Sequence, residues 1–383
     1  MKTIKDYIVY DPKLGAAISG TKVNFFSDSH RPPGLKYYSS TQATAEIIKS
    51  NRQWAITGVG SPRFQFIYLM LPCDCNQKCR GCFMGQDKSR LPQELNGPFF
   101  SDCELAAICD FACQHGALAA VHGGGGELFT WPGAFPYIEF IKQHGLAMMI
   151  FTNGTLLDQK RIHRLNELGV ALTISMRDTA EIYHNQIINA DGFKRSLDAI
   201  ELAINEGMHL ENRLAVEMPV TIDNEKRILN NLLPVLRALK IVPMIEEYIQ
   251  TTTSAEENQC CHSFAQARRF FRRLAQKDAG LGINWSPRYG QRMLGEPKCQ
   301  RPLFSFAVFP SGEVTDCPTN IVSYGNIRRQ SLEEIFSSTR FRQTLTDYQL
   351  CPCSRFYTEH NHDIPADLPA YLQEKERETK YSD

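Results

Sequence analysis

Three closely spaced cysteines are the residues of this chain best suited to metal chemistry. Cys75, Cys79 and Cys82 occur in the segment CDCNQKCRGCF with a C-x3-C-x2-C spacing. Three thiolates in one loop can bind three irons of a four-iron cluster and leave the fourth iron open to an external ligand. The alternative is a zinc site, in which Cys73 supplies a fourth thiolate and closes the coordination shell. The spacing alone leaves both interpretations open.

A second set of cysteines lies near the C-terminus. Cys299 and Cys317 frame the segment CQRPLFSFAVFPSGEVTDC, and Cys351 and Cys353 follow in a CPC sequence. Two alternating apolar runs flank Pro-Ser-Gly in FAVFPSGEVTDC, which predicts a β-hairpin that brings Cys299 and Cys317 near each other. Four thiolates suffice for one closed iron–sulfur cluster, and a structural zinc site is again the alternative.

Short apolar segments alternate with amphipathic segments from residue 64 to residue 250. We predict strands at 64–71, 118–122, 147–152, 171–176, 214–220 and 243–249. We predict helices between them near 102–115, 134–144, 158–168, 192–206 and 225–239. This alternation favours parallel β/α units in an α/β fold, in which loops after the carboxyl ends of the strands carry the chemistry. The first cysteine loop directly follows the first of these strands.

The residues at these strand ends resemble the motifs of the radical SAM enzymes. After the C-x3-C-x2-C loop, the motifs that end the next three strands are Gly125-Gly126-Glu127, Thr152-Asn153-Gly154 and Ser175. The resemblance spans about residues 64 to 250 and implies a partial (β/α)6 TIM-like barrel. It also implies a 4Fe-4S cluster that binds S-adenosylmethionine, and a low-potential electron donor such as flavodoxin or ferredoxin. Reductive cleavage then gives methionine and a 5'-deoxyadenosyl radical.

The same resemblance assigns residues to S-adenosylmethionine. They are Phe83, Gly125, Gly126, Glu127, Asn153 and Ser175. The Gly-Gly-Glu motif is expected at the methionine amino group, the loop of Phe83 at the adenine, and the remaining two residues near the ribose and the carboxylate. Relatives often carry an arginine after the fourth strand, where this chain has Gln186, and Arg177 is the alternative contact for the carboxylate.

The C-terminal cysteines resemble the SPASM extension, which is called Twitch in its one-cluster form. The Cys299-x12-Gly312-x4-Cys317 signature and the following YGNIRRQSLEEIF are typical of it. With the CPC pair as the remaining ligands, the resemblance implies one auxiliary 4Fe-4S cluster in a small β-hairpin and helix domain. We divide the chain into an N-terminal extension of unknown role (1–63), the radical SAM barrel (64–255), a linker helix with the SPASM/Twitch-like domain (256–365) and a polar tail (366–383).

The resemblance implies that the reaction begins with hydrogen-atom abstraction from a substrate carbon. If the auxiliary cluster accepts the electron of the substrate radical, the net reaction is a two-electron oxidation. Modification of a peptide or protein side chain is favoured over dehydrogenation of a small natural product. One alternative is an epimerase in which Cys260 or Cys261 returns a hydrogen atom to the substrate radical. The other interpretation of this pair is that both cysteines are ordinary residues of a loop or helix start. A second alternative function is a non-catalytic zinc-binding scaffold.

Strand ends supply further candidate contacts for the substrate. These are His122, Glu246, Glu247 and Tyr248, and the alternative is ordinary polarity of the barrel interior.

The composition limits the other partners. Lys and Arg together number 42, as do Asp and Glu, so the formal charge of zero gives no field that attracts nucleic acid or anionic lipid. The N-terminus does not resemble a signal peptide, and the chain contains no apolar stretch of membrane-spanning length. We therefore predict a cytoplasmic protein that binds neither nucleic acid nor membrane, where its 13 cysteines stay reduced.

Overall fold

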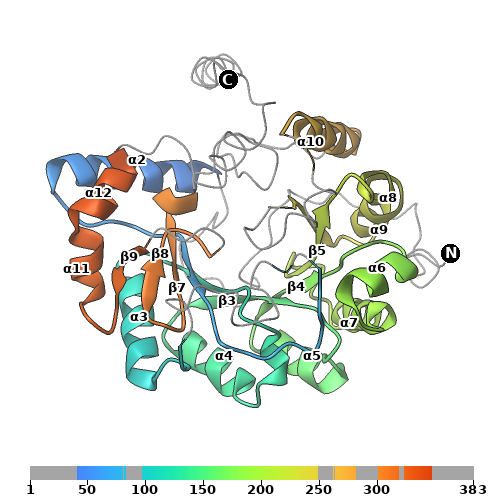
Figure 1. Ribbon diagram of the computed structural model, residues 1–383, viewed down its shortest axis with the longest axis horizontal. Coiled ribbons are helices and arrows are strands. Elements are labelled where there is room, and N and C mark those ends of the chain that lie inside the picture. The colour runs from blue at the N-terminus through green and yellow to red at the C-terminus, as the bar shows by residue number, and fades with distance from the viewer. Residues whose placement is uncertain are drawn as a thin grey trace.

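The strands of the described residues form one curved sheet (Figure 1). The computed structural model describes residues 41–80, 82, 97–248, 262, 264–281, 301–318 and 323–346. The strand order in the sheet is β6-β5-β4-β3-β2-β1-β7-β8-β9. Strands β1 to β6 are parallel to their neighbours, as expected for a partial (β/α)6 barrel. Within the described ranges, no helix combines the length and apolarity needed to cross a membrane.

All six predicted barrel strands are present. They are β1 (Phe66–Leu69), β2 (Ala119–His122), β3 (Ala147–Thr152), β4 (Ala171–Ser175), β5 (Leu214–Val220) and β6 (Val242–Glu247). Successive side chains of a strand point to opposite faces, so each strand contributes to two cores. The inward face carries a small core that includes Tyr68, Val121, Met149 and Ala215. The residues between them pack outward against the helices in a larger core.

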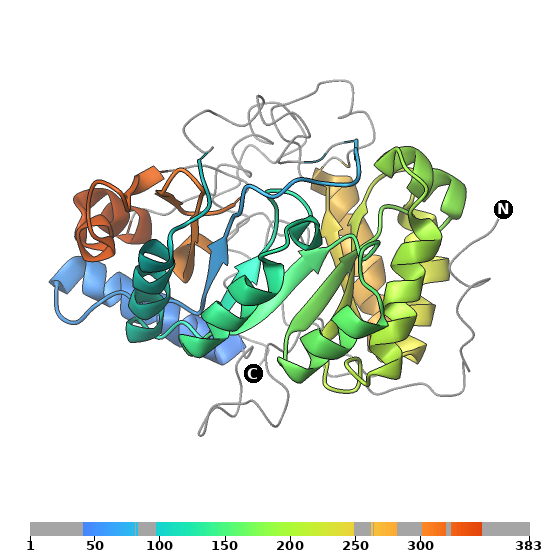
Figure 2. The ribbon, with the colours of Figure 1, turned by 90° about the horizontal axis from the view of Figure 1, so that it is seen from below.

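The connecting helices lie along the outer side of the sheet (Figures 1 and 2). They are α3 (Asp102–Gln114), α4 (Ala134–Gln143), α5 (Gln159–Glu167), α6 (Glu181–Ile188), α7 (Phe193–Asn205), α8 (Glu225–Arg227) and α9 (Leu233–Ala238). A π-helical turn, Ile228–Leu232, joins α8 to α9 just before Pro234, whose missing N–H cannot continue an α-helical ladder. The predicted helices are confirmed, whereas α6 was not predicted. Helix α10 (Phe264–Ala279) follows β6. A buried ion pair between Arg237 of α9 and Asp278 of α10 connects the two helices.

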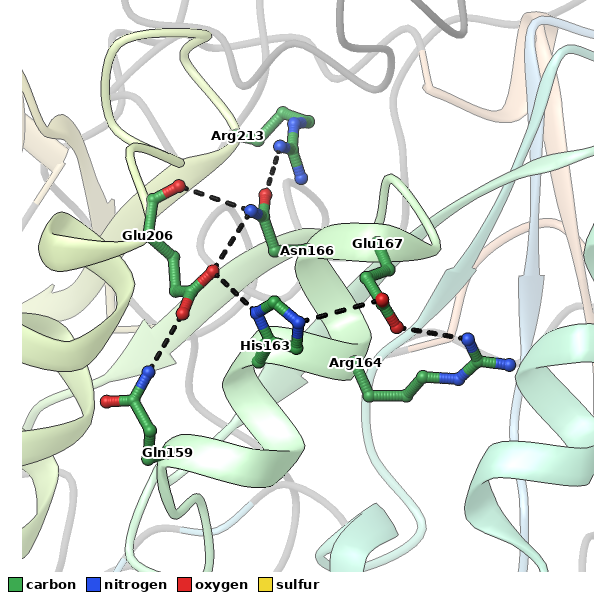
Figure 3. Close-up of polar contacts among 7 residues, drawn as sticks. All are labelled: Gln159, His163, Arg164, Asn166, Glu167, Glu206 and Arg213. Carbon is green, nitrogen blue, oxygen red and sulfur yellow. Dashed lines mark hydrogen bonds and ion pairs between the residues drawn. The ribbon is translucent and has the colours of Figure 1, made fainter.

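A polar network fixes the outer helices near the amino ends of β4 and β5 (Figure 3). The Glu206 carboxylate, after α7, accepts a hydrogen bond of 2.8 Å from Gln159 and contacts His163 Nδ1 at 3.1 Å. The buried Arg213, before β5, donates to Asn166 of α5 and to the carbonyl of Val170. These contacts tie α5, α7 and two strands together away from the strand ends that carry the motifs.

The C-terminal strands extend the barrel sheet. Strand β7 (Ser305–Val308) pairs in parallel with β1, and β8 (Glu313–Thr315) and β9 (Ser323–Asn326) continue the sheet in antiparallel pairs. The predicted hairpin is therefore confirmed as β7–β8. Its strands continue the barrel sheet instead of forming a sheet of their own. Because β7 lies beside β1, the SPASM-like segment begins next to the strand that leads into the first cysteine loop.

Aromatic packing joins the C-terminal elements to the barrel. Phe64, which precedes β1, lies 4.7 Å from Phe306 of β7 and 4.8 Å from Phe336 of α11 (Leu332–Ser337) between ring centroids. Phe341 of α12 (Thr339–Thr346) packs on Phe336 at 4.8 Å and on Trp54 of α2 (Thr41–Thr57) at 6.1 Å. The described part of the N-terminal extension thus packs against the C-terminal elements, at the edge of the sheet that β7, β8 and β9 form (Figure 1).

Candidate functional site

The first cysteine loop rests on two glycines of the loop after β2. Gly125 and Gly126 have φ angles of +83° and +131°, which L side chains rarely adopt. A Cβ atom on Gly125 would lie 1.8 Å from the carbonyl oxygen of Leu71, and one on Gly126 would lie 2.1 Å from that of Cys73. Both positions therefore require glycine because the backbone of the cysteine loop packs directly on them.

Backbone hydrogen bonds hold the cysteine loop at both of its ends. The carbonyl of Asp74 accepts from the backbone N–H of Glu127 at 2.8 Å. The N–H groups of Lys78 and Arg80 donate to the last carbonyls of α6, those of Ile188 and Ile187, at 2.9 and 2.8 Å. The loop after β2 and the end of α6 consequently fix the path from Asp74 to Arg80, which carries Cys75 and Cys79.

The three thiols differ in their exposure to solvent. Cys75 is reached by solvent, while Cys79 and Cys82 are half-buried. Partial burial raises the pKa of the Cys75 thiol to about 11, and burial also raises the pKa of Cys79, so metal binding must displace protons. Among the described residues, no three Cys, His, Asp or Glu side chains are gathered around one point as a single-ion site requires. A four-iron cluster spaces its three thiolates more widely than a single ion does, since each thiolate binds a different iron.

Glu127 connects the ends of β2 and β3. Its buried carboxylate accepts hydrogen bonds from the Thr152 hydroxyl at 2.7 Å and from the backbone N–H of Asn153 at 2.8 Å. Burial raises the pKa of this carboxyl, and these donors oppose the rise. The carboxylate is therefore engaged in positioning the two loops, and the sequence motif gave no sign that Thr152 is its partner.

Asn153 and Ser175 occupy the next two strand ends. The Asn153 side chain donates to Asn76 Oδ1 in the cysteine loop at 2.8 Å, and its carbonyl accepts from the Ser196 hydroxyl at 2.7 Å. Ser175 is half-buried at the end of β4, directly across from Glu217 of β5. The structure thus brings the strand-end residues around the cysteine loop, and their contacts with S-adenosylmethionine remain a prediction.

Arg177 and Glu217 form a charged pair at the same edge of the sheet. The Arg177 guanidinium lies 3.9 Å from the Glu217 carboxylate, and its positive charge opposes the rise in the pKa of the Cys79 thiol that burial causes. The backbone N–H of Arg177 donates to Nδ1 of the buried His184 at 3.2 Å. Sequence reasoning missed Glu217, although an acidic residue within the buried strand LAVEMPV was a usable signal.

Several predicted site residues lie outside the described residues. They are Phe83, Cys260, Cys261, Cys299, Cys351 and Cys353. Of the four predicted auxiliary ligands, Cys317 is described: it is buried just after β8, and its carbonyl accepts a hydrogen bond of 3.0 Å from Thr315. These assignments remain predictions.

The candidate substrate contacts on β2 and β6 divide between the two faces of the sheet. Val121 packs in the inward core, so its neighbour His122 faces outward, where its ring lies 6.2 Å from that of Tyr137 on α4. On β6, Val242 and Met244 belong to the inward core, which places Glu246 on the inward face and Glu247 on the outer one. The expected contact of His122 with a substrate in the barrel is therefore wrong, because strand alternation turns this residue toward the helices.

The outward, fully buried position of His122 predicts a pH-dependent stability. Burial lowers the pKa of its imidazole to about 4, whereas an unfolded histidine titrates near 6.5. Between these values the unfolded chain binds a proton that the folded chain does not, so stability falls as the pH falls. We expect the free energy of unfolding, measured by anaerobic denaturant titration, to fall between pH 7 and pH 5.5. The fall should be about 1 kcal/mol larger in wild type than in His122→Gln. The exposed His163→Gln is the control, and an equal loss in wild type and His122→Gln would contradict the prediction.

Two family models match the chain. Residues 71–229 match the radical SAM superfamily, and residues 299–356 match SPASM, an iron–sulfur cluster-binding domain. The chain is a radical SAM enzyme with a C-terminal SPASM domain. Its cofactors are accordingly S-adenosylmethionine, the 4Fe-4S cluster of the radical SAM domain and an auxiliary cluster of the SPASM domain. The fixed three-thiol loop and the glycine cradle beneath it fit the first of these clusters.

The individual relatives share low sequence identity with this chain. The tungsten-containing aldehyde ferredoxin oxidoreductase cofactor-modifying protein of Pyrococcus furiosus is 26% identical over an alignment of 303 residues, which covers 72% of this chain and 82% of the relative. SuiB of Streptococcus suis with bound S-adenosylmethionine superposes with a TM-score of 0.59 at 13% identity, over 82% of this chain and 75% of SuiB. The anSMEcpe protein with bound AdoMet gives 0.52 at 18% identity, over 73% and 82% of the two chains. These two structures share the fold of this radical SAM enzyme.

Proposed function

We propose that this radical SAM enzyme is an oxidoreductase that removes two electrons and two hydrogens from its substrate. The observation that carries the proposal is the packing of the three-cysteine loop on Gly125 and Gly126, at the carboxyl end of a parallel sheet. In barrels of parallel strands this end holds the chemistry. The loop would hold the cluster through Cys75, Cys79 and Cys82.

The residues around the loop would bind and orient S-adenosylmethionine. When bound, cluster and cofactor together supply the 5'-deoxyadenosyl radical that abstracts a hydrogen atom. The methionine amino group would lie at the Gly-Gly-Glu motif, beside the cysteine loop that packs on Gly125 and Gly126. Glu127 would keep this backbone in place through Thr152, while Asn153 and Ser175 face the same edge and Phe83 follows the last cysteine.

The SPASM domain would accept the second electron. Its proposed ligands are Cys299, Cys317, Cys351 and Cys353. Cys317 follows β8, and only β7 separates β8 from β1 in the sheet, so this ligand lies near the strand that leads into the first cysteine loop. Transfer of the radical's electron to this cluster and loss of a proton to a base would complete a two-electron oxidation of the substrate. A flavodoxin or ferredoxin would supply the electron that initiates each cleavage.

A peptide is the proposed substrate. SuiB bound to the precursor peptide SuiA superposes on 85% of this chain with a TM-score of 0.58, which supports room for a peptide in this fold. The name of the Pyrococcus furiosus relative points instead to modification of a cofactor, which makes a small molecule the second candidate. The inward position of Glu246 offers a polar contact to either one.

The product mass distinguishes oxidation from epimerisation. With a reductant and S-adenosylmethionine, we expect 5'-deoxyadenosine and a product two mass units lighter than the substrate, because one hydrogen leaves as an atom and one as a proton. Mass spectrometry of candidate precursor peptides, repeated in deuterated water, makes the measurement. A product one unit heavier in deuterated water, and lost in Cys260→Ala or Cys261→Ala, would establish the epimerase alternative instead.

A further inference from the structure

Arg177 and Glu217 place two opposite charges next to one proposed cluster ligand. The Arg177 guanidinium lies 3.9 Å from the Glu217 carboxylate, and its charge acts on the neighbouring Cys79 thiol. The Arg177 side chain is 27% exposed and that of Glu217 only 9%, so water screens the pair weakly. The sequence suggested Arg177 only as an alternative contact for the methionine carboxylate, and Glu217 has been assigned no function.

The fold holds both side chains in place from two directions. Glu217 lies opposite Ser175 in the β4–β5 register, and the N–H of Met176 donates to the Glu217 carbonyl at 2.8 Å. Arg177 is anchored through its own N–H to His184 of α6, the helix whose last carbonyls also hold the cysteine loop. The distance from the guanidinium to the loop is therefore set by one helix and two strands.

We propose that Arg177 and Glu217 set the reduction potential of the cluster held by Cys75, Cys79 and Cys82. Arg177 acts as a positioning residue that stabilises the reduced cluster through the Cys79 sulfur, and Glu217 limits this effect by partly neutralising the arginine. The inference rests on the proposed ligand role of the three cysteines. It assigns the pair to cluster reduction, in place of the expected contact between Arg177 and the methionine carboxylate.

The charges determine the sign of each effect. Reduction transfers one electron from a low-potential donor to the cluster, so the donor is oxidised and the site gains one negative charge. A nearby cation and a hydrogen bond to a ligand sulfur both favour that added charge, and a nearby anion opposes it. Removing Arg177 should therefore make reduction harder, and neutralising Glu217 should make it easier.

Redox titration followed by electron paramagnetic resonance tests the proposal. Wild type, Arg177→Gln, Arg177→Lys and Glu217→Gln are reconstituted anaerobically and titrated at pH 8. The component of the reduced spectrum that changes on adding S-adenosylmethionine reports the cluster with the open iron. We expect Arg177→Gln to lower the equilibrium constant for reduction about tenfold, a shift of about 59 mV for one electron, and Glu217→Gln to raise it. Arg177→Lys keeps the charge and should fall between wild type and Arg177→Gln.

Matched controls and a second readout keep the outcomes distinct. Arg164→Gln and Glu167→Gln change an exposed Arg–Glu pair, 3.1 Å apart on the outer face of α5, and should leave the potential unchanged (Figure 3). Shifts of the same sign in Arg177→Gln and Glu217→Gln, or shifts no larger than the controls, overturn the inference. If Arg177→Gln binds no iron, the shifts in reduction potential of Glu217→Gln and Arg177→Lys test the inference instead. A wild type without a spectrum that responds to S-adenosylmethionine would instead overturn the proposed function, and this inference with it.

Discussion

Replacing Cys75, Cys79 and Cys82 together by alanine is expected to abolish the cleavage of S-adenosylmethionine to 5'-deoxyadenosine. The loop holds these thiols on a fixed backbone path, and without them no cluster with an open iron can form there. Wild type should carry about eight irons per chain and the triple variant about four, which the C-terminal cysteines retain. Iron and sulfide analysis and chromatography of 5'-deoxyadenosine after anaerobic reconstitution make the measurement.

Helix α3 supplies a matched control for this variant. Cys103, Cys109 and Cys113 are three further described cysteines, and Cys109 is buried in the core between α3 and the sheet. Their joint replacement by alanine removes the same number of thiols and should leave about eight irons and wild-type cleavage. Persistent cleavage in the first variant, or its loss in the control alone, would sink the assignment of the cluster ligands.

Gly125→Ala is expected to cause a loss nearly as large, although it removes no ligand. The new Cβ would lie 1.8 Å from the Leu71 carbonyl oxygen, so the backbone that leads into the cysteine loop must move. Because a cluster needs its three thiolates at set positions, we expect about four irons per chain and no detectable 5'-deoxyadenosine.

Gly207→Ala is a control that introduces the same backbone strain as Gly125→Ala without a steric clash. Gly207 has a φ of +77°, close to the +83° of Gly125, but an added Cβ there meets nothing within 4 Å. Both variants carry the left-handed strain of about 1 kcal/mol, and only Gly125→Ala displaces the loop. The control should keep about eight irons and normal cleavage. A wild-type iron content in Gly125→Ala would show that the cysteine loop does not depend on its packing against Gly125.

The sequence by itself determined the barrel and its motifs. The six barrel strands and the connecting helices other than α6 follow from local periodicity, since a buried parallel strand is a short apolar run and a covering helix repeats apolar residues every three to four positions. The C-x3-C-x2-C, Gly-Gly-Glu and SPASM motifs were readable for a related reason. Cysteine and glycine are chosen by chemistry and by backbone conformation at single positions, so their spacing carries information without knowledge of the fold.

Only the tertiary structure decided which distant segments meet. Nothing local in the short helix α6 shows that its last carbonyls bind Lys78 and Arg80, and nothing local in β7 shows that it pairs with β1. The partner of Glu217 and the outward direction of His122 likewise depend on register and strand alternation. Such contacts arise from packing between segments far apart in the chain, whereas sequence periodicity records only which face of each segment is buried.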